Sequence, residues 1–162
     1  MNKKALGLPM TAFDLAMRFM GTTEVRGQLD NPQVMAFLTA DAGWPEHDEV
    51  PWCSGFVNYI AKLMRLPRSK SLRARSWLEV GRPILDTEWG DQSIGYTTVI
   101  LKRGHGDQPG PEVINAPGHV GWLAGYDADR GLVHILGGNQ SNQVSVAAYS
   151  ANRILGVRDL IG

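Results

Sequence analysis

The stretch Pro51-Trp52-Cys53-Ser54-Gly55-Phe56-Val57-Asn58 holds the only cysteine of the chain. Pro51 suits the start of a helix. Apolar residues then recur with helical spacing at Phe56, Ile60 and Leu63. Cys53 therefore falls in the first turn of a predicted helix, where unpaired N–H groups and the helix dipole lower a thiol pKa. A lone cysteine is either a small buried apolar residue or a reactive thiolate, and this position favours the thiolate.

Length, composition and charge limit the classes of protein to consider. The chain has 162 residues, 43% of them hydrophobic, which fits one domain spanning residues 1–162. The formal net charge is zero, so we expect neither nucleic acid nor a membrane surface as a partner. The protein is also expected to be a monomer. Between Lys62 and Arg82 there are seven basic residues and one acidic residue, which form either a solvated surface or a contact with an anionic polymer.

The N-terminus does not have the pattern of a secretion signal. Met1-Asn2-Lys3-Lys4 resembles the charged start of one, but Pro9 breaks the apolar stretch that follows and Asp14 closes it. No apolar run reaches the roughly 18 residues needed to cross a bilayer. We therefore expect a protein that is made in the cytoplasm without a signal peptide.

The order of helix and strand signals indicates the fold class. Four helices are predicted: one capped by Thr11 and ended by Gly21, one from Asn31-Pro32 to Gly43, the Cys53 helix, and one from about Ser71 to Val80. Strands are predicted over residues 97–101, 119–124, 132–136, 143–147 and 153–157. Helices followed by hairpin-connected strands indicate an α+β domain, with N-terminal helices packed on a C-terminal antiparallel β-sheet.

A cysteine nucleophile needs a base, and the chain offers four histidines. His119 is the best candidate, because it stands at the edge of a predicted strand between Gly118 and Gly121, where a ligand can approach the backbone. His134 alternates with apolar residues and is expected to face the core. The other two histidines, His47 and His105, lie in predicted loops.

A third polar group is needed to orient the base. The predicted hairpin places Gly137-Gly138-Asn139-Gln140 on the strand next to His119. Two glycines before an amide indicate either a tight backbone approach or an ordinary turn. On this pattern Asn139 is expected to face the imidazole, with Gln140 as the alternative. Because side chains alternate across a strand, only one of the two can do so.

Four motifs in this order resemble a known superfamily. They are residues 51–58, Ala74-Arg75-Ser76-Trp77-Leu78, Gly118-His119-Val120-Gly121-Trp122 and Leu136-Gly137-Gly138-Asn139-Gln140-Ser141. Together they resemble a compact bacterial and phage group of the NlpC/P60 and CHAP papain-like superfamily. The resemblance spans about residues 22 to 158.

The resemblance implies a papain-like fold and hydrolysis of an amide bond in bacterial peptidoglycan. It assigns the nucleophile to Cys53, the base to His119 and the third residue to Asn139. The chain has one cysteine and no tight His/Asp/Glu spacing of the kind that binds zinc, so we expect neither a metal nor a cofactor. Trp52, Trp122 and Gln140 are candidates for substrate binding, whereas Trp77 is expected in the core. Glu24 and Asp48 match acidic positions of the group. The long Gly/Pro-rich loop before His119 departs from the group, which has a short connection there.

Several functions remain open at this level. The enzyme is expected to be an endopeptidase or an N-acetylmuramoyl-L-alanine amidase acting on the cell wall. Alternatives are a catalytically silent wall-binding module and an acyl-transfer enzyme acting on another amide. The absence of an added wall-binding domain in the sequence fits a phage lysin, a phage-tail hydrolase or a secreted antibacterial effector, and an effector implies an immunity protein as partner.

Overall fold

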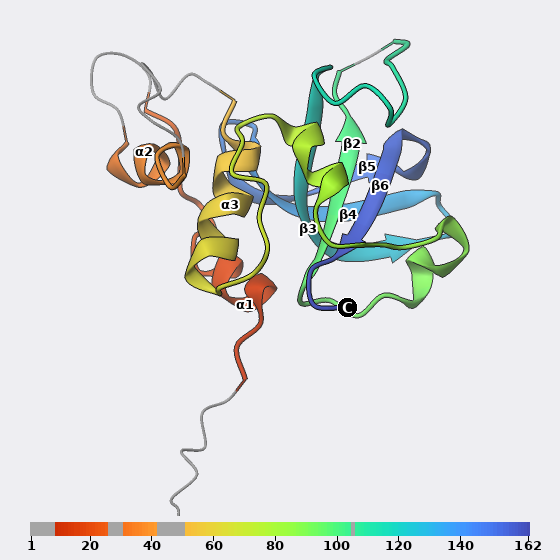
Figure 1. The fold of residues 1–162 in the computed structure, drawn as a ribbon, viewed down its shortest axis with the longest axis horizontal. Helices are drawn as coiled ribbons and strands as arrows, with labels where there is room; N and C mark the ends of the chain where they lie inside the picture. Colours follow the sequence, from red (N-terminus) through yellow and green to blue (C-terminus); the bar gives the residue numbers. More distant parts are fainter. Residues whose placement is uncertain (1–8, 26–30, 42–50, 105) are drawn as a thin grey trace, which may run out of the picture.

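The chain forms its helices first and its sheet second (Figure 1). The structure is a computed structural model and describes residues 9–25, 31–41, 51–104 and 106–162. The α-helices are α1 (Ala12–Met17), α2 (Pro32–Leu38) and α3 (Cys53–Leu63), and the 3-10 helices are η1 (Ala74–Glu79), η2 (Asp86–Asp91) and η3 (Ala151–Arg153). The strands are β1 (Arg82–Pro83), β2 (Thr97–Lys102), β3 (Gly118–Asp127), β4 (Leu132–Gln140), β5 (Gln143–Ser150) and β6 (Ile154–Asp159).

Local signals set the starts of the first two helices. Thr11 and Asp14 form a reciprocal capping box at α1, as predicted. Asn31 caps α2 with its side chain, and Pro32 occupies the first turn. The predicted end of this helix at Gly43 lies outside the described residues, but α2 itself already ends at Leu38. The predicted helix over residues 71–80 is a shorter 3-10 helix, η1.

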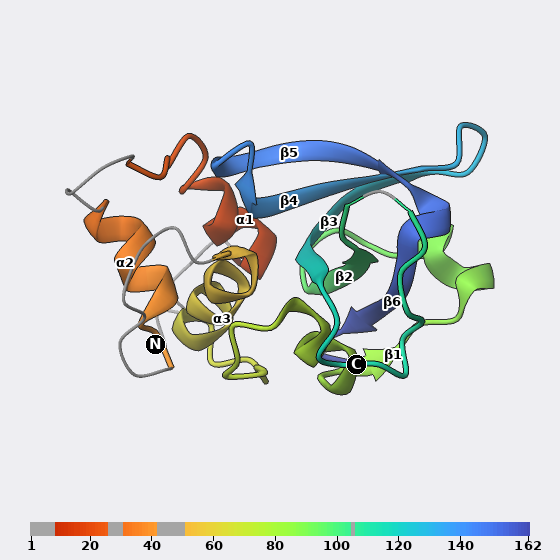
Figure 2. The same cartoon turned by 90° about the horizontal axis from the view of Figure 1, so that it is seen from above.

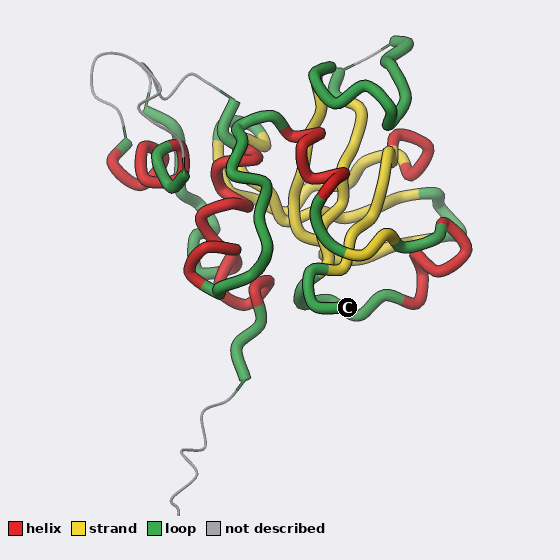
Figure 3. The backbone as a smooth tube through the Cα atoms, in the orientation of Figure 1, coloured by secondary structure: helices red, strands yellow, loops and turns green. Residues whose placement is uncertain are grey.

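The strands form one antiparallel sheet in the order β1-β6-β2-β3-β4-β5. The predicted α+β class is therefore confirmed. The last strand, β6, returns to pair with β2, so the sheet is not a simple meander. Figures 2 and 3 show the three α-helices gathered on one side of the molecule, with α2 farthest from the strands.

Helix α3 packs against β3 and β4, and this contact brings Cys53 to His119. One core fills the space between the helices and the sheet, and it includes Phe37, Trp52, Phe56 and Trp122. A second, smaller core covers the opposite face of the sheet. Gly55 lets α2 and α3 meet closely, because a Cβ at this position would lie 2.9 Å from the carbonyl oxygen of Phe37.

Candidate active site

Cys53 is the first residue of α3, and its side chain is only 3% exposed. Trp52 is the N-cap residue but makes no side-chain cap. The backbone N–H of Cys53 thus belongs to the set of first-turn donors that have no partner within the helix. The predicted position of the thiol at a helix start is confirmed.

His119 lies near the start of β3, is 9% exposed, and is close enough to Cys53 for each of the two side chains to shift the pKa of the other. The backbone N–H of Val120 is also close enough to the Cys53 sulfur to lower the pKa of the thiol. The structure therefore brings together the two residues that the sequence singled out as thiol and imidazole. His134, by contrast, is half-buried opposite Gly125 in the β3–β4 hairpin, toward its turn. His47 and His105 lie outside the described residues.

The other ring nitrogen of His119 faces Gln140. Nε2 of His119 lies 3.0 Å from Oε1 of Gln140. The Gln140 side-chain nitrogen donates to the carbonyl oxygens of Ile135, at 3.2 Å, and Ser145, at 2.6 Å. Because these two carbonyls can only accept, they fix the amide with its oxygen toward His119. Nε2 must then carry a proton, which leaves Nδ1 of the neutral ring free to accept the thiol proton.

The expectation that Asn139 faces the imidazole is wrong. The pairing of β4 with β5 shifts register between Gly137 and Gln140, and Asn139 has a φ of 58°. This bulge interrupts the alternation of side chains on which the expectation rested. Gly137 and Gln140 thus share the His119 side, although they are three residues apart. Asn139 is half-exposed and makes no hydrogen bond to His119.

Gly137 and Gly138, the two glycines before Asn139, are each required by a different close contact. A Cβ at Gly137 would lie 2.9 Å from Oε1 of Gln140 and 3.3 Å from Nε2 of His119, so a side chain there would press into their hydrogen bond. A Cβ at Gly138 would lie 2.7 Å from the Trp52 ring and 2.9 Å from Cβ of Phe56. Gly137 therefore makes room for the site, and Gly138 lets β4 approach the start of α3. The tight approach indicated by the sequence is confirmed.

Tyr149 is a site residue that the sequence analysis missed. Its hydroxyl donates to Oε1 of Gln140 at 2.9 Å and lies 3.4 Å from Nε2 of His119. The amide oxygen has two lone pairs and accepts from both neighbours. Burial, together with the nearby charge of Cys53, raises the pKa of Tyr149 to about 12. No local motif marks Tyr149, because it reaches the site from β5, nine residues beyond Gln140.

The thiol and the imidazole favour each other's charged form. Burial alone raises the pKa of the Cys53 thiol, but the hydrogen bond and charge of His119, the N–H of Val120 and the charge of Arg103 outweigh burial and lower it. Burial alone lowers the pKa of His119, but the hydrogen bond and charge of Cys53 and the hydrogen bond to Gln140 raise it. The result is a pair in which the thiolate of Cys53 and the imidazolium of His119 stabilise each other.

Two pockets flank this pair. One has a volume of about 270 Å³ and is lined by Cys53, by residues 72–74 and by residues 115–118. The other has a volume of about 440 Å³ and is lined by His119, Asn139, Gln140 and Tyr149, among others. Arg103 lines both pockets. A substrate that crosses from one pocket to the other would pass over the thiol and the imidazole.

Two of the predicted substrate-binding residues are placed elsewhere. Trp52 and Trp122 are fully buried in the core and line neither of the two pockets that flank the site. Trp52 stacks on Phe37 with ring centroids 5.9 Å apart, because α2 covers it. Gln140 does line a pocket, but its amide is engaged with His119. Trp77 is fully buried, as predicted.

The acidic candidates take no part in the described site. One carboxylate oxygen of Glu24 accepts a hydrogen bond from the Trp52 indole nitrogen at 3.1 Å, so this residue supports the start of α3. Asp48 lies outside the described residues.

Arg75 holds the long loop between β2 and β3. The side chain is fully buried, and its guanidinium donates to the carbonyl oxygens of Pro109, Gly110, Val113 and Pro117 at 2.7–3.2 Å. The same loop supplies residues 115–117 to the Cys53 pocket. The basic residues between Lys62 and Arg82 are therefore not all solvated surface, because Arg75 is buried and positions the loop that forms one wall of the site.

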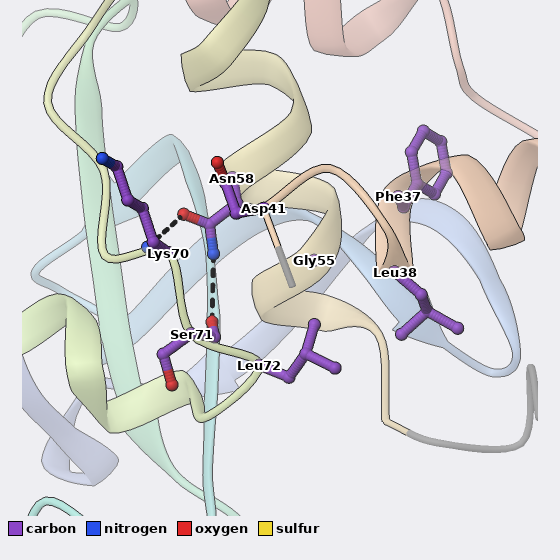
Figure 4. A pocket seen from close by; sticks show the side chains of 8 residues that line it. All are labelled: Phe37, Leu38, Asp41, Gly55, Asn58, Lys70, Ser71 and Leu72. Atoms are coloured by element: carbon purple, nitrogen blue, oxygen red, sulfur yellow. Dashed lines mark hydrogen bonds between the residues drawn. The ribbon is translucent and has the colours of Figure 1, made fainter. Parts of the chain in front are cut away.

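A third cavity is separate from the catalytic pair (Figure 4). It lies beside α2 and α3 and holds only about 10 Å³, about one water molecule. In it Asn58 donates to the Ser71 carbonyl at 3.0 Å and accepts from the Lys70 N–H at 3.0 Å, as the dashed lines show. These bonds tie α3 to the segment that continues into the Cys53 pocket. The cavity therefore supports the site and does not bind substrate.

The described residues contain no cluster of three or more His, Cys, Asp or Glu side chains that could hold a metal ion. Within the same residues no helix is long and apolar enough to span a bilayer. A comparison with models of protein families found no match, and a search of curated proteins found none either. The family resemblance therefore stays a prediction from the four motifs.

Proposed function

We propose that the protein is a cysteine hydrolase with a papain-like arrangement that cleaves an amide bond of bacterial peptidoglycan. The observation that supports this most is the chain Cys53–His119–Gln140, in which a buried amide fixes the imidazole and the imidazole lowers the thiol pKa. A thiol, a base and an orienting group in hydrogen-bonded order are the parts that covalent acyl transfer requires. The four ordered motifs support the choice of peptidoglycan as substrate.

The reaction follows from the geometry. The Cys53 thiolate attacks the amide carbonyl carbon and forms a tetrahedral intermediate. Its negative oxygen accepts from the backbone N–H of Cys53 at the start of α3. The imidazolium of His119 gives its Nδ1 proton to the leaving nitrogen, and the C–N bond breaks, leaving a thioester on Cys53. Water, deprotonated by Nδ1, then hydrolyses the thioester and regenerates the pair. Throughout, Gln140 holds Nε2 in its protonated form.

Digestion of purified peptidoglycan tests this proposal. The wild-type protein is expected to release soluble fragments, and mass spectrometry of their new termini identifies the bond that is cut. Cys53→Ala and His119→Ala are each expected to release none, and the double variant should be no worse than either, because nucleophile and base act as a unit. Arg130→Gln, at the far turn of the β3–β4 hairpin, serves as the folded control. Equal fragment release by wild type and Cys53→Ala would disprove the proposal.

A further inference from the structure

The pocket on the His119 side is strongly basic. Lys102, Arg103 and Arg153 line it, and among the residues that the structure describes no acidic side chain does. Among the ion pairs of the described residues none involves these three cations. Three positive charges that have no ion-pair partner in the described part of the chain surround one 440 Å³ pocket, and they mark a place where an anion is stabilised.

Arg153 is fixed in this pocket. Its Nε and Nη2 donate to the carbonyl oxygen of Lys102 at 3.2 and 3.1 Å, and its side chain is half-buried. A carbonyl orients the guanidinium without neutralising it. Lys102 is the last residue of β2 and Arg153 the last of η3, so both cations are carried by ordered backbone. A guanidinium held in this way is prepared to bind a carboxylate.

The position of the pocket shows which part of a substrate enters it. His119 must deliver its proton to the leaving nitrogen, so the leaving fragment lies beside the imidazole. The basic pocket is lined by His119 and not by Cys53, whereas the 270 Å³ pocket is lined by Cys53 and not by His119. The first is therefore the leaving-group side and the second the acyl side.

We propose that Lys102 and Arg153 bind a carboxylate of the leaving peptide and thereby select acidic leaving fragments. This inference rests on the proposed function and adds the class of substrate to it. An amine fragment released from a peptide carries a carboxylate whenever its C-terminus or an acidic side chain is not amidated. Arg103 contributes positive charge to the same pocket but also lowers the pKa of Cys53, so substitution of Arg103 would not separate binding from chemistry.

The test uses two soluble peptide substrates that differ only in the leaving fragment, whose carboxylates are either free or converted to carboxamides. The wild type is expected to cleave the carboxylate form with about tenfold higher kcat/KM. Arg153→Gln and Lys102→Gln should each lose most of this preference by raising KM, with the carboxamide substrate almost unaffected. Arg153→Lys should keep part of the preference, because it keeps the charge. Arg130→Gln should keep all of it.

Binding to the inactive Cys53→Ala protein provides a second readout. The isolated leaving fragment should bind more tightly as carboxylate than as carboxamide, and added salt or Arg153→Gln should remove the difference. Cleavage of both substrates at equal rates would overturn the carboxylate pocket and leave the hydrolase intact. If the wild type cleaved neither substrate, the proposed function would be overturned. If the inactive protein then also bound the carboxylate and carboxamide fragments equally tightly, the carboxylate pocket would be overturned as well.

Discussion

Oε1 of Gln140 lies 3.0 Å from Nε2 of His119, and two backbone carbonyls that accept from the amide nitrogen fix the amide so that its oxygen, and not its nitrogen, faces the ring. The contact determines the tautomer of the imidazole. It also turns Nδ1 toward Cys53, so that an amide with no contact to the thiol decides which nitrogen takes the proton.

Gln140→Ala should therefore lower kcat by roughly 100-fold or more, because the imidazole loses both its orientation and its tautomer. Asn139→Gly is the matched comparison, since glycine accepts the positive φ of this position while removing the side chain. It should change kcat by no more than about threefold. Steady-state rates on one soluble substrate measure both variants. A larger loss in Asn139→Gly than in Gln140→Ala would contradict the assignment.

The thiolate should persist at lower pH than in a free cysteine. The lowered pKa of Cys53 predicts rapid alkylation by iodoacetamide below pH about 8.5, the ordinary value for this group. In His119→Ala the main group that lowers the pKa is gone while burial still raises it, so half-maximal alkylation should move upward. Rates of single-site alkylation across pH, followed by mass spectrometry, test this. An unchanged profile in His119→Ala would show that the two groups are not coupled.

The alkaline limit of activity should belong to His119 rather than to Tyr149. The raised pKa of His119 extends the active range above about 6.5, the unperturbed value, and activity is lost when the ring deprotonates. Tyr149, with a pKa of about 12, stays protonated throughout. Tyr149→Phe should thus reduce kcat less than tenfold, by loosening Gln140, and keep the shape of the pH profile. If Tyr149→Phe no longer lost activity at high pH, that loss would have to be assigned to the Tyr149 hydroxyl.

Gly137→Ala should damage the site without unfolding the protein. The added methyl group would lie 2.9 Å from Oε1 of Gln140 and displace it from His119. We expect roughly a 10- to 100-fold loss in kcat. Gly125→Ala is the control, because its nearest contact, with the His134 ring at 3.8 Å, is of ordinary length. Circular dichroism and activity together distinguish a distorted site from a lost fold.

Arg75→Met should destabilise the protein by about 2–4 kcal/mol, because four backbone carbonyls lose a buried charged donor. KM should rise as well, since the loop released by this change lines the Cys53 pocket. Urea unfolding gives the stability, and steady-state kinetics gives KM. Arg130→Met, whose ion pair is exposed at 3.7 Å, should stay within about 0.5 kcal/mol of wild type. An Arg75→Met protein as stable as this control would show that the hydrogen bonds from Arg75 to the loop do not stabilise the fold.

Short-range features of the sequence determined much of this molecule. The Thr11 cap, the Asn31-Pro32 helix start, the approximate positions of the strands and the place of Cys53 in a first helical turn all depend on residues within about four positions of one another. They were predicted correctly for that reason. The assignment of His119 as the base rested on glycines next to it, and the structure brings this residue to the thiol.

Only the tertiary structure decided the remaining features of the site. A bulge in the β4–β5 pairing placed Gln140 rather than Asn139 against His119, and no pattern within one strand reveals a bulge that depends on its partner. Packing of α2 and β4 over Trp52 buried a residue that local sequence made a candidate groove wall. Tyr149 contacts His119 across 30 residues of sequence, and Arg75 contacts the long loop across 34–42 residues. The local sequence was enough to identify the reacting groups, Cys53 and His119. Their partners were decided by long-range packing, because the contacts to Gln140, Tyr149 and the long loop form only when the sheet packs against α3.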